Sequence, residues 1–211
     1  MRFLFDFLSP YAYTAWHLSL GLAARHGRAL EPEPVLLAGL LGAHGTKGPA
    51  EVPAKRIYTF KDAFRKATAA GLPLLPPPSH PFNPLLALRT VLAADPGDRT
   101  RLVTALWRGA WGGGGGVEDP ANVARLAREA GFDGEELVAR SSACKERLRE
   151  LTESAVREGV FGVPTLFVDG EMFWGVDALP FAELRLLGRD PFEPSTLAHW
   201  ADLPATAGRN R

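Results

Sequence analysis

Two proline-containing turns, far apart in the sequence, are the places where this chain could do chemistry. In the first, the apolar run Arg2-Phe-Leu-Phe-Asp-Phe-Leu8 stops at Ser9-Pro10, and helix-like sequence follows at once. In the second, Val163-Pro164 stands directly before the apolar segment Thr-Leu-Phe-Val. Serine is a preferred N-cap and proline is favoured at the first helical position, so the first turn predicts a helix that begins at Pro10.

Ser9 has two interpretations, a structural one and a chemical one. Taken alone it is a plain helix cap, the usual role of a serine before a helix-starting proline. It also lies where free N–H groups and the helix dipole favour an anion. There its hydroxyl can donate a hydrogen bond to a thiolate supplied by a ligand, which lowers the pKa of that thiol. Disulfide exchange is excluded, because position 12 is alanine and Cys144 is the single cysteine, which we expect to be buried and structural.

The Val163-Pro164 turn could present backbone to the same ligand. A proline that enters a strand directly after Gly-Val is a candidate cis proline. Such a turn exposes the N–H and C=O of Val163, which could pair with an extended thiol peptide by strand addition. The alternative is an ordinary proline at the start of a strand. Ser9 and Pro164 together are more specific than either alone.

The elements that must position these turns fall into two strand-containing segments. The first reads as a strand over 2–8, a helix from Pro10 to Gly27 and a second strand over 30–37, whose prolines suggest a sheet edge. A loop is expected over 38–55. The second segment has a hairpin around Asp169-Gly170 and a last helix over 179–187. A βαβ unit and a ββα unit that close into one sheet make an α/β fold of the thioredoxin-like type.

Residues 56–157 show no strand signal and are expected to form an all-helical insertion. Helices are predicted over 57–70, 85–94 and 99–111, from Asp119-Pro120 to Gly131, and as one long helix over 135–158. The five glycines 112–116 read as a flexible turn, with a mobile lid as the less favoured alternative. We therefore expect a thioredoxin-like domain (1–55 plus 158–190), a helical insertion domain (56–157) and a C-terminal tail (191–211).

Composition narrows the class of partners. Lys+Arg and Asp+Glu balance at 24 each, so no basic field for nucleic acid and no polybasic membrane anchor is expected. No apolar run approaches the roughly 20 residues of a membrane span, and the N-terminus has no signal-peptide pattern, which favours a cytoplasmic protein. The five histidines are scattered without metal-ligand spacing, so no bound metal is expected.

Four segments carry a resemblance to a known family: FDFLSPYAY, KRIYTFKDAFRKA, HPFNPLLALR and REGVFGVPTLFVDGEMFWGVDAL. They resemble the 2-hydroxychromene-2-carboxylate isomerases, which are close relatives of kappa-class glutathione transferases in the DsbA-like group of thioredoxin folds. The resemblance extends from Phe3 to about Leu187. It implies a homodimeric isomerase of aromatic compound catabolism that uses glutathione as cofactor.

The resemblance also implies roles for individual residues. Ser9 would contact the glutathione sulfur, and Val163, before a cis Pro164, would pair with the cysteinyl backbone. Lys55 would lie near the glycyl carboxylate. Asp177 would hold the γ-glutamyl amine, and the N–H of Val176 would serve the neighbouring carboxylate. Six aromatic side chains are candidates for a pocket that takes a flat aromatic acid: Tyr11, Tyr13, Phe82, Trp107, Trp111 and Trp174.

The implied mechanism is nucleophilic catalysis by the cofactor. The thiolate adds to the chromene, the ring opens, a single bond rotates, and elimination regenerates glutathione. Two alternatives stay open: a kappa-type glutathione transferase or peroxidase, and a non-catalytic module that binds a thiol peptide. Two departures from the family bear on the choice, because Thr46 stands where an asparagine is usual and glycines 112–116 replace polar and acidic residues.

Overall fold

A mixed sheet of four strands carries both turns in the computed structural model, which describes residues 1–193, 195, 197, 200 and 203–204. The strands are β1 (Arg2–Phe5), β2 (Glu31–Pro34), β3 (Thr165–Val168) and β4 (Glu171–Trp174). Their order is β2-β1-β3-β4, with β2 parallel to β1 and the other neighbours antiparallel. The predicted thioredoxin-like α/β class is confirmed, and β2, with its two prolines, lies at a sheet edge as predicted.

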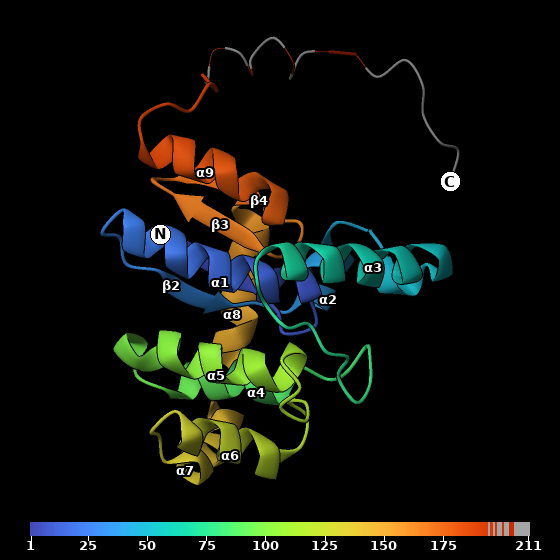
Figure 1. The fold of residues 1–211 in the computed structure, drawn as a ribbon, viewed down its shortest axis with the longest axis vertical. Helices are drawn as coiled ribbons and strands as arrows, with labels where there is room; N and C mark the ends of the chain where they lie inside the picture. Colours follow the sequence, from blue (N-terminus) through green and yellow to red (C-terminus); the bar gives the residue numbers. More distant parts are fainter. Residues whose placement is uncertain (194, 196, 198–199, 201–202, 205–211) are drawn as a thin grey trace.

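The helices surround this sheet on several sides (Figure 1). In that view α9 lies beside β3 and β4 at one end, and α6 and α7 lie at the opposite end. No helix in the described part of the chain combines the length and apolar character needed to cross a bilayer. The bounds are α1 Pro10–Arg25, α2 Leu37–Ala43, α3 Pro53–Ala69, α4 Leu85–Ala93, α5 Arg99–Trp111, α6 Pro120–Glu129, α7 Gly134–Arg140, α8 Lys145–Arg157 and α9 Leu179–Leu186.

Aromatic side chains join the sheet to the helices that follow it. Phe7, two residues after β1, packs edge-on against Trp107 of α5, with ring centroids 4.6 Å apart. Phe3 packs against Trp16 of α1 at 5.4 Å, and Trp16 Nε1 donates to Thr104 Oγ1 of α5. Trp107 is therefore core rather than pocket wall.

The division of the chain at 55/56 and 157/158 into two domains stays a proposal.

The Asp169-Gly170 hairpin forms as predicted. Both residues have positive φ, 48° and 83°, which a type I′ turn requires. The turn sets the register in which Leu166 faces Phe173. This register places the end of β4 beside the segment that precedes β3.

The expected loop over 38–55 is wrong in part, because α2 occupies Leu37–Ala43. The segment Leu-Ala-Gly-Leu-Leu-Gly-Ala contains two glycines, which lower its intrinsic helix propensity although its leucines and alanines favour a helix. Contacts from distant residues compensate: the Asp6 carboxylate accepts from the N–H of Leu37, and Thr152 Oγ1 of α8 accepts from the N–H of Leu36. Both bonds satisfy N–H groups at the start of α2 that the helix itself leaves open.

The single long helix predicted over 135–158 is also wrong. A 3₁₀ turn over Ser141–Cys144 separates α7 from α8. The hydroxyls of Ser141 and Ser142 donate to the carbonyls of Val138 and Ala139, and such local bonds compete with regular helix. Because of this turn Cys144 is partly exposed, not buried as expected. The predicted tail, 191–211, lies largely outside the described residues.

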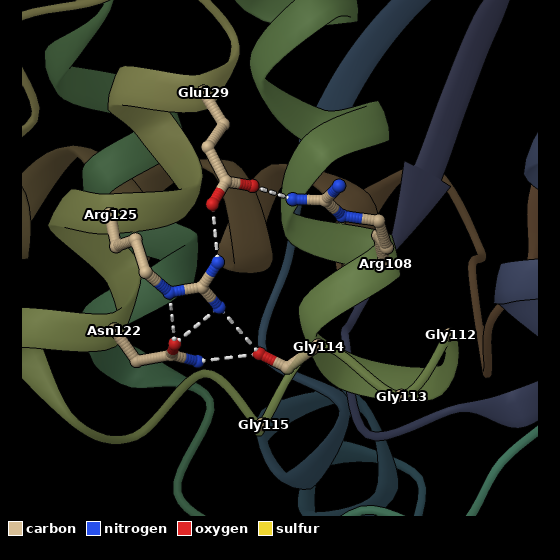
Figure 2. Close-up of a pocket in the computed structure, with 8 residues that line it drawn as sticks. All are labelled: Arg108, Gly112, Gly113, Gly114, Gly115, Asn122, Arg125 and Glu129. Carbon is tan, nitrogen blue, oxygen red and sulfur yellow. Dashed lines mark hydrogen bonds and ion pairs between the residues drawn. The ribbon is translucent and has the colours of Figure 1, made fainter.

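The five glycines form a turn, as expected, and the turn is hydrogen-bonded to α6. Figure 2 shows Asn122 and Arg125 of α6 reaching the carbonyl oxygen of Gly114, at 2.9 and 3.0 Å. Arg125 also pairs with Glu129, which pairs with Arg108 as well, so one carboxylate bridges the two arginines that line the cavity of about 510 Å³ beside the turn. These side chains secure the turn.

The glycine turn also supports the proline-rich connector between α3 and α4. The N–H of Leu75 donates to the carbonyl of Trp111 at 2.8 Å. A Cβ added to Gly116 would lie 3.2 Å from Pro78 Cδ. The tight contact explains why side chains are excluded here, and it fixes the connector that leads to His80.

Replacing Gly114 by alanine is expected to destabilise the fold by about 1–2 kcal/mol. The new Cβ would lie 2.9 Å from the carbonyl oxygen of Arg108 and 3.0 Å from Gly109 Cα, and neither backbone atom can move cheaply. Gly97→Ala is the matched control, because nothing lies within 4 Å of its Cβ position. Urea unfolding checks the pair, and equal midpoints for the two variants would contradict the argument.

Candidate functional site

Ser9 caps helix α1 at the end of the first turn. Its backbone is extended (φ −89°, ψ 113°), and its Oγ accepts from the N–H of Ala12 at 3.1 Å, so the predicted cap is confirmed. The cap uses the hydroxyl oxygen as an acceptor and does not use its proton. That proton is therefore available for donation to an anion. The α1 dipole favours a negative charge at the same place. Capping and anion binding are therefore compatible in one side chain.

The buried carboxyl group of Asp6 helps to fix the turn that precedes Ser9. Asp6 is fully buried, and its carboxylate accepts from the N–H of Leu8 at 3.0 Å and from Leu37 at 2.8 Å. Its carbonyl accepts from the N–H of Ser9 at 3.0 Å. Burial raises the pKa of Asp6 to about 6, against the two backbone bonds, which lower it. Asp6 thus ties the turn to the start of α2.

Two ring N–H groups hold the turn from the side of the helical segment. Trp111 Nε1 donates to the carbonyl of Phe7 at 2.8 Å. His80 Nε2 lies 3.1 Å from the carbonyl oxygen of Leu8, and since a carbonyl only accepts, Nε2 carries the proton. Burial lowers the pKa of His80, so its imidazole is neutral near pH 7. The backbone before Ser9 is consequently held at successive peptide groups.

The second turn lies beside the first, and its predicted cis peptide bond between Val163 and Pro164 is confirmed. Its flanks are tied down by Thr165 Oγ1, which donates to the carbonyl of Gly162, and by the N–H of Gly175, which donates to that of Pro164. Within the described residues, neither the N–H nor the C=O of Val163 makes a hydrogen bond. Both remain available to an extended backbone placed alongside.

Both turns open on one cavity of about 930 Å³. Its wall is made by Leu8–Tyr11, by α2 and the loop that follows it, by the first half of α3, by His80 and Pro81, and by 161–163 with Trp174. The size and the mainly apolar wall with a few polar groups are typical of a small-molecule site. Glu51 and two cations, Lys47 and Arg56, lie on the same wall.

The predicted cofactor residues are only partly brought together. Ser9 and Val163 line the cavity, whereas Pro164, Lys55 and Val176 do not. Lys55 is exposed in the first turn of α3, and successive residues of a helix point about 100° apart. Since the neighbouring Arg56 faces the cavity, Lys55 faces elsewhere. The cations that reach the cavity, Lys47 and Arg56, were missed in the sequence.

Asp177 lies outside the cavity wall, in a network of charges behind Tyr11. Its carboxylate is 3.4 Å from Lys66 Nζ, which also pairs with Asp62 at 2.5 Å. The Tyr11 hydroxyl donates to Asp62 at 2.8 Å. Burial and the Asp62 carboxylate raise the pKa of Tyr11 well above its ordinary value. Tyr11 lines the cavity as a neutral phenol whose proton is committed to Asp62.

The predicted aromatic residues separate into wall and core. Tyr11 and Trp174 line the cavity, but Tyr13, Phe82 and Trp111 are buried behind it. Tyr13 donates to the carbonyl of Pro73 and Trp111 to that of Phe7, so both act as supports. Phe161, which was not predicted, also lines the cavity, and its ring centroid lies 5.0 Å from that of Trp174. Its position two residues before Val163 is the feature of the sequence that could have indicated a place near the cavity.

Comparison with known proteins places this architecture. The model of the DsbA-like thioredoxin domain matches residues 1–186. The chain belongs to the DsbA-like thioredoxin family. It is 33% identical to a 2-hydroxychromene-2-carboxylate isomerase of Sphingobium xenophagum, over 88% of this chain and 96% of that protein. It is 26% identical to glutathione S-transferase kappa 1 of Rattus norvegicus, over 85% and 87%.

A solved structure supports the same grouping. The structure of a 2-hydroxychromene-2-carboxylate isomerase superposes with a TM-score of 0.81 at 28% identity, over 97% of this chain and 98% of that one. The resemblance stated from the sequence motifs is confirmed. Within the DsbA-like family, this chain has a serine at the start of α1 and no second cysteine in its sequence. With a single cysteine, the chain cannot exchange disulfides between its own side chains.

Proposed function

We propose that this chain is a glutathione-dependent isomerase of aromatic acids like 2-hydroxychromene-2-carboxylate, in which Ser9 stabilises the glutathione thiolate. One observation carries the proposal: the Ser9 hydroxyl proton and the Val163 peptide backbone, neither of which has a partner among the described residues, open on the same cavity. A thiol peptide needs both, one for its sulfur and one for its main chain. The relatives named as isomerases support the reaction type.

The residues present fit glutathione. Ser9 would hold the sulfur and Val163 the cysteinyl backbone, while Lys47 and Arg56 supply positive charge for a carboxylate. Asp177 and the N–H of Val176 remain our proposal for the γ-glutamyl end. At the glycyl end the proposal moves from Lys55, which does not line the cavity, to Lys47 and Arg56, which do. When bound, glutathione supplies a thiolate that acts as the nucleophile.

The protein's own contribution is to prepare the site for an anion. The Ser9 hydroxyl and the α1 dipole lower the free energy of a thiolate relative to the thiol. Asp6, His80 and Trp111 hold the turn, so little reorganisation is needed when charge develops. Apolar side chains of α2 and α3 exclude water around the sulfur, which strengthens these interactions.

The deciding experiment assays purified protein on 2-hydroxychromene-2-carboxylate with and without glutathione. Isomerisation should depend on glutathione and saturate with it, while a thiol-free alkyl analogue of the tripeptide should inhibit competitively. Full activity in the absence of any thiol would overturn the proposal. A kappa-type transferase is the second candidate, because kappa-class relatives align over a similar share of the chain. Faster conjugation of an aryl halide than isomerisation by the same sample would favour it.

Replacing Trp174 by alanine is expected to raise KM for the aromatic substrate roughly tenfold. Trp174 is 53% exposed and lines the cavity beside Phe161, so its ring has free surface on which a flat aromatic ligand can pack. Phe181→Ala is the control, because Phe181 is also 53% exposed but lies on α9, away from the cavity wall. Steady-state kinetics with each substrate varied checks this. An unchanged KM for the aromatic acid, or an equal effect of Phe181→Ala, would argue against the assignment.

A further inference from the structure

We propose that a cleft between α2, α4 and α8 is a second ligand site, which takes a small amphipathic anion such as a carboxylate on an apolar ring or chain. The cleft has a volume of about 620 Å³. This falls in the range of small-molecule sites. It shares no lining residue with the cavity of Ser9.

The floor of the cleft is apolar and comes from three different elements. Leu36 precedes α2, Leu85 begins α4, and Leu148 and Val156 lie two turns apart on α8. Leu148 is buried, and the other three are partly buried, so apolar surface remains within reach of a ligand. An apolar body placed here would lose contact with water on one whole side.

The rim of the cleft is strongly cationic. Arg89, Lys145, Arg149 and Arg157 line it, against the single carboxylate of Glu153. Arg149 is already paired, with Glu146 at 2.8 Å and Glu153 at 2.7 Å. The other three cations make no ion pair within the described part of the chain. Charge complementarity therefore calls for an anionic occupant.

Arg89 marks where the anion would sit. It lies in the middle of α4 and lines the cleft, and its Nε is buried without a hydrogen-bond partner among the described residues. A buried donor left unpaired is costly, and natural proteins rarely keep one without a reason. A carboxylate that accepts from the guanidinium fork would satisfy it, in the geometry for which arginine is suited.

Helix α2 separates this cleft from the Ser9 cavity. Leu36, Gly39 and Ala43 face the cleft, at intervals of three and four residues, whereas Leu37 and Leu41 face the cavity. A Cβ on Gly39 would lie 2.9 Å from Thr152 Cγ2, so α2 and α8 approach closely below the cleft. Two ligands can therefore bind on opposite sides of one helix, and binding at each can be tested separately.

Calorimetric titration with decanoate tests the proposal on the full chain. We expect saturable binding that weakens at least tenfold in Arg89→Met, which keeps an unbranched apolar side chain but removes the guanidinium group and its charge. Arg140→Met is the matched control, because Arg140 is exposed on α7 and lines neither cavity. The uncharged methyl ester of decanoate should bind at least tenfold more weakly than decanoate.

A second variant protects against a folding defect in Arg89→Met. Val156→Trp fills the cleft but retains Arg89, and it should abolish decanoate binding while thermal unfolding monitored by circular dichroism stays cooperative. Equal binding by Arg89→Met and wild type would overturn the proposal. So would binding that is lost in Trp174→Ala, since that result assigns decanoate to the Ser9 cavity. A dimer in sedimentation that fails to bind decanoate would assign the cleft to a second copy of the chain. None of these outcomes depends on the glutathione assay.

Discussion

Replacing Ser9 by alanine is expected to lower kcat/KM for glutathione-dependent isomerisation roughly 100- to 1000-fold. The substitution removes the one hydroxyl proton that the cavity offers to a thiolate at the start of α1. It also removes the helix cap, at a cost of about 1 kcal/mol of stability. Steady-state kinetics measures the first effect and urea unfolding the second. A change in activity below threefold would contradict the role assigned to Ser9.

A second substitution at Ser9 separates capping from catalysis. Aspartate caps helices as well as serine does, so Ser9→Asp should keep wild-type stability. Its carboxylate would repel a thiolate, and activity should fall at least as far as in Ser9→Ala. Ser19→Ala on the same helix is the control, because Ser19 Oγ is buried, has no partner in the part of the chain that the structure describes, and lies away from the cavity. If Ser9→Asp were active, capping alone would account for the polar residue at position 9.

The second large effect is a pH dependence of stability that Asp6 imposes. The pKa of Asp6 is about 6 in the folded chain, against 3.8 for an ordinary aspartate, with burial as the main cause. A raised folded pKa means that the folded state binds the proton more tightly than the unfolded state. Its contribution to stability is therefore fully present below pH 4 and is lost as pH rises through 6. The loss should reach roughly 3 kcal/mol relative to Asp6→Asn, which cannot ionise.

Urea unfolding of wild type and Asp6→Asn, at intervals between pH 4 and 8, measures this difference. The gap between the two curves should move by the stated amount in favour of Asp6→Asn as pH rises, and then level off. Asp169→Asn is the control. Arg28 holds the pKa of the exposed Asp169 below its ordinary value, so any change occurs at lower pH and in the opposite direction. Parallel curves for wild type and Asp6→Asn would show that Asp6 is not a buried ionisable group.

Several features of the fold and site could be predicted because neighbouring residues decide them. Ser9-Pro10 starts a helix and Asp169-Gly170 closes a hairpin through local backbone preferences, which tertiary contacts only reinforce. The apolar segments around them are short and well separated, so the βαβ and ββα order was legible. The Val163-Pro164 turn was found for the same reason, since only an X-Pro bond readily adopts the cis form.

Other features depended on residues far apart in the chain. Helix α2 was missed because its first N–H is satisfied by Asp6, 31 positions earlier, and the turn before Ser9 is held by His80, 72 positions later. The packing of α3 and of the connector against the sheet decides which cations and which aromatic rings face the cavity. On a helix, one position separates a side chain in the cavity, Arg56, from one directed elsewhere, Lys55. The sequence by itself determined the two turns and the elements that carry them. Only tertiary packing decided which side chains meet around the cavity, because a side chain's direction is set by contacts between elements and not by its neighbours in sequence.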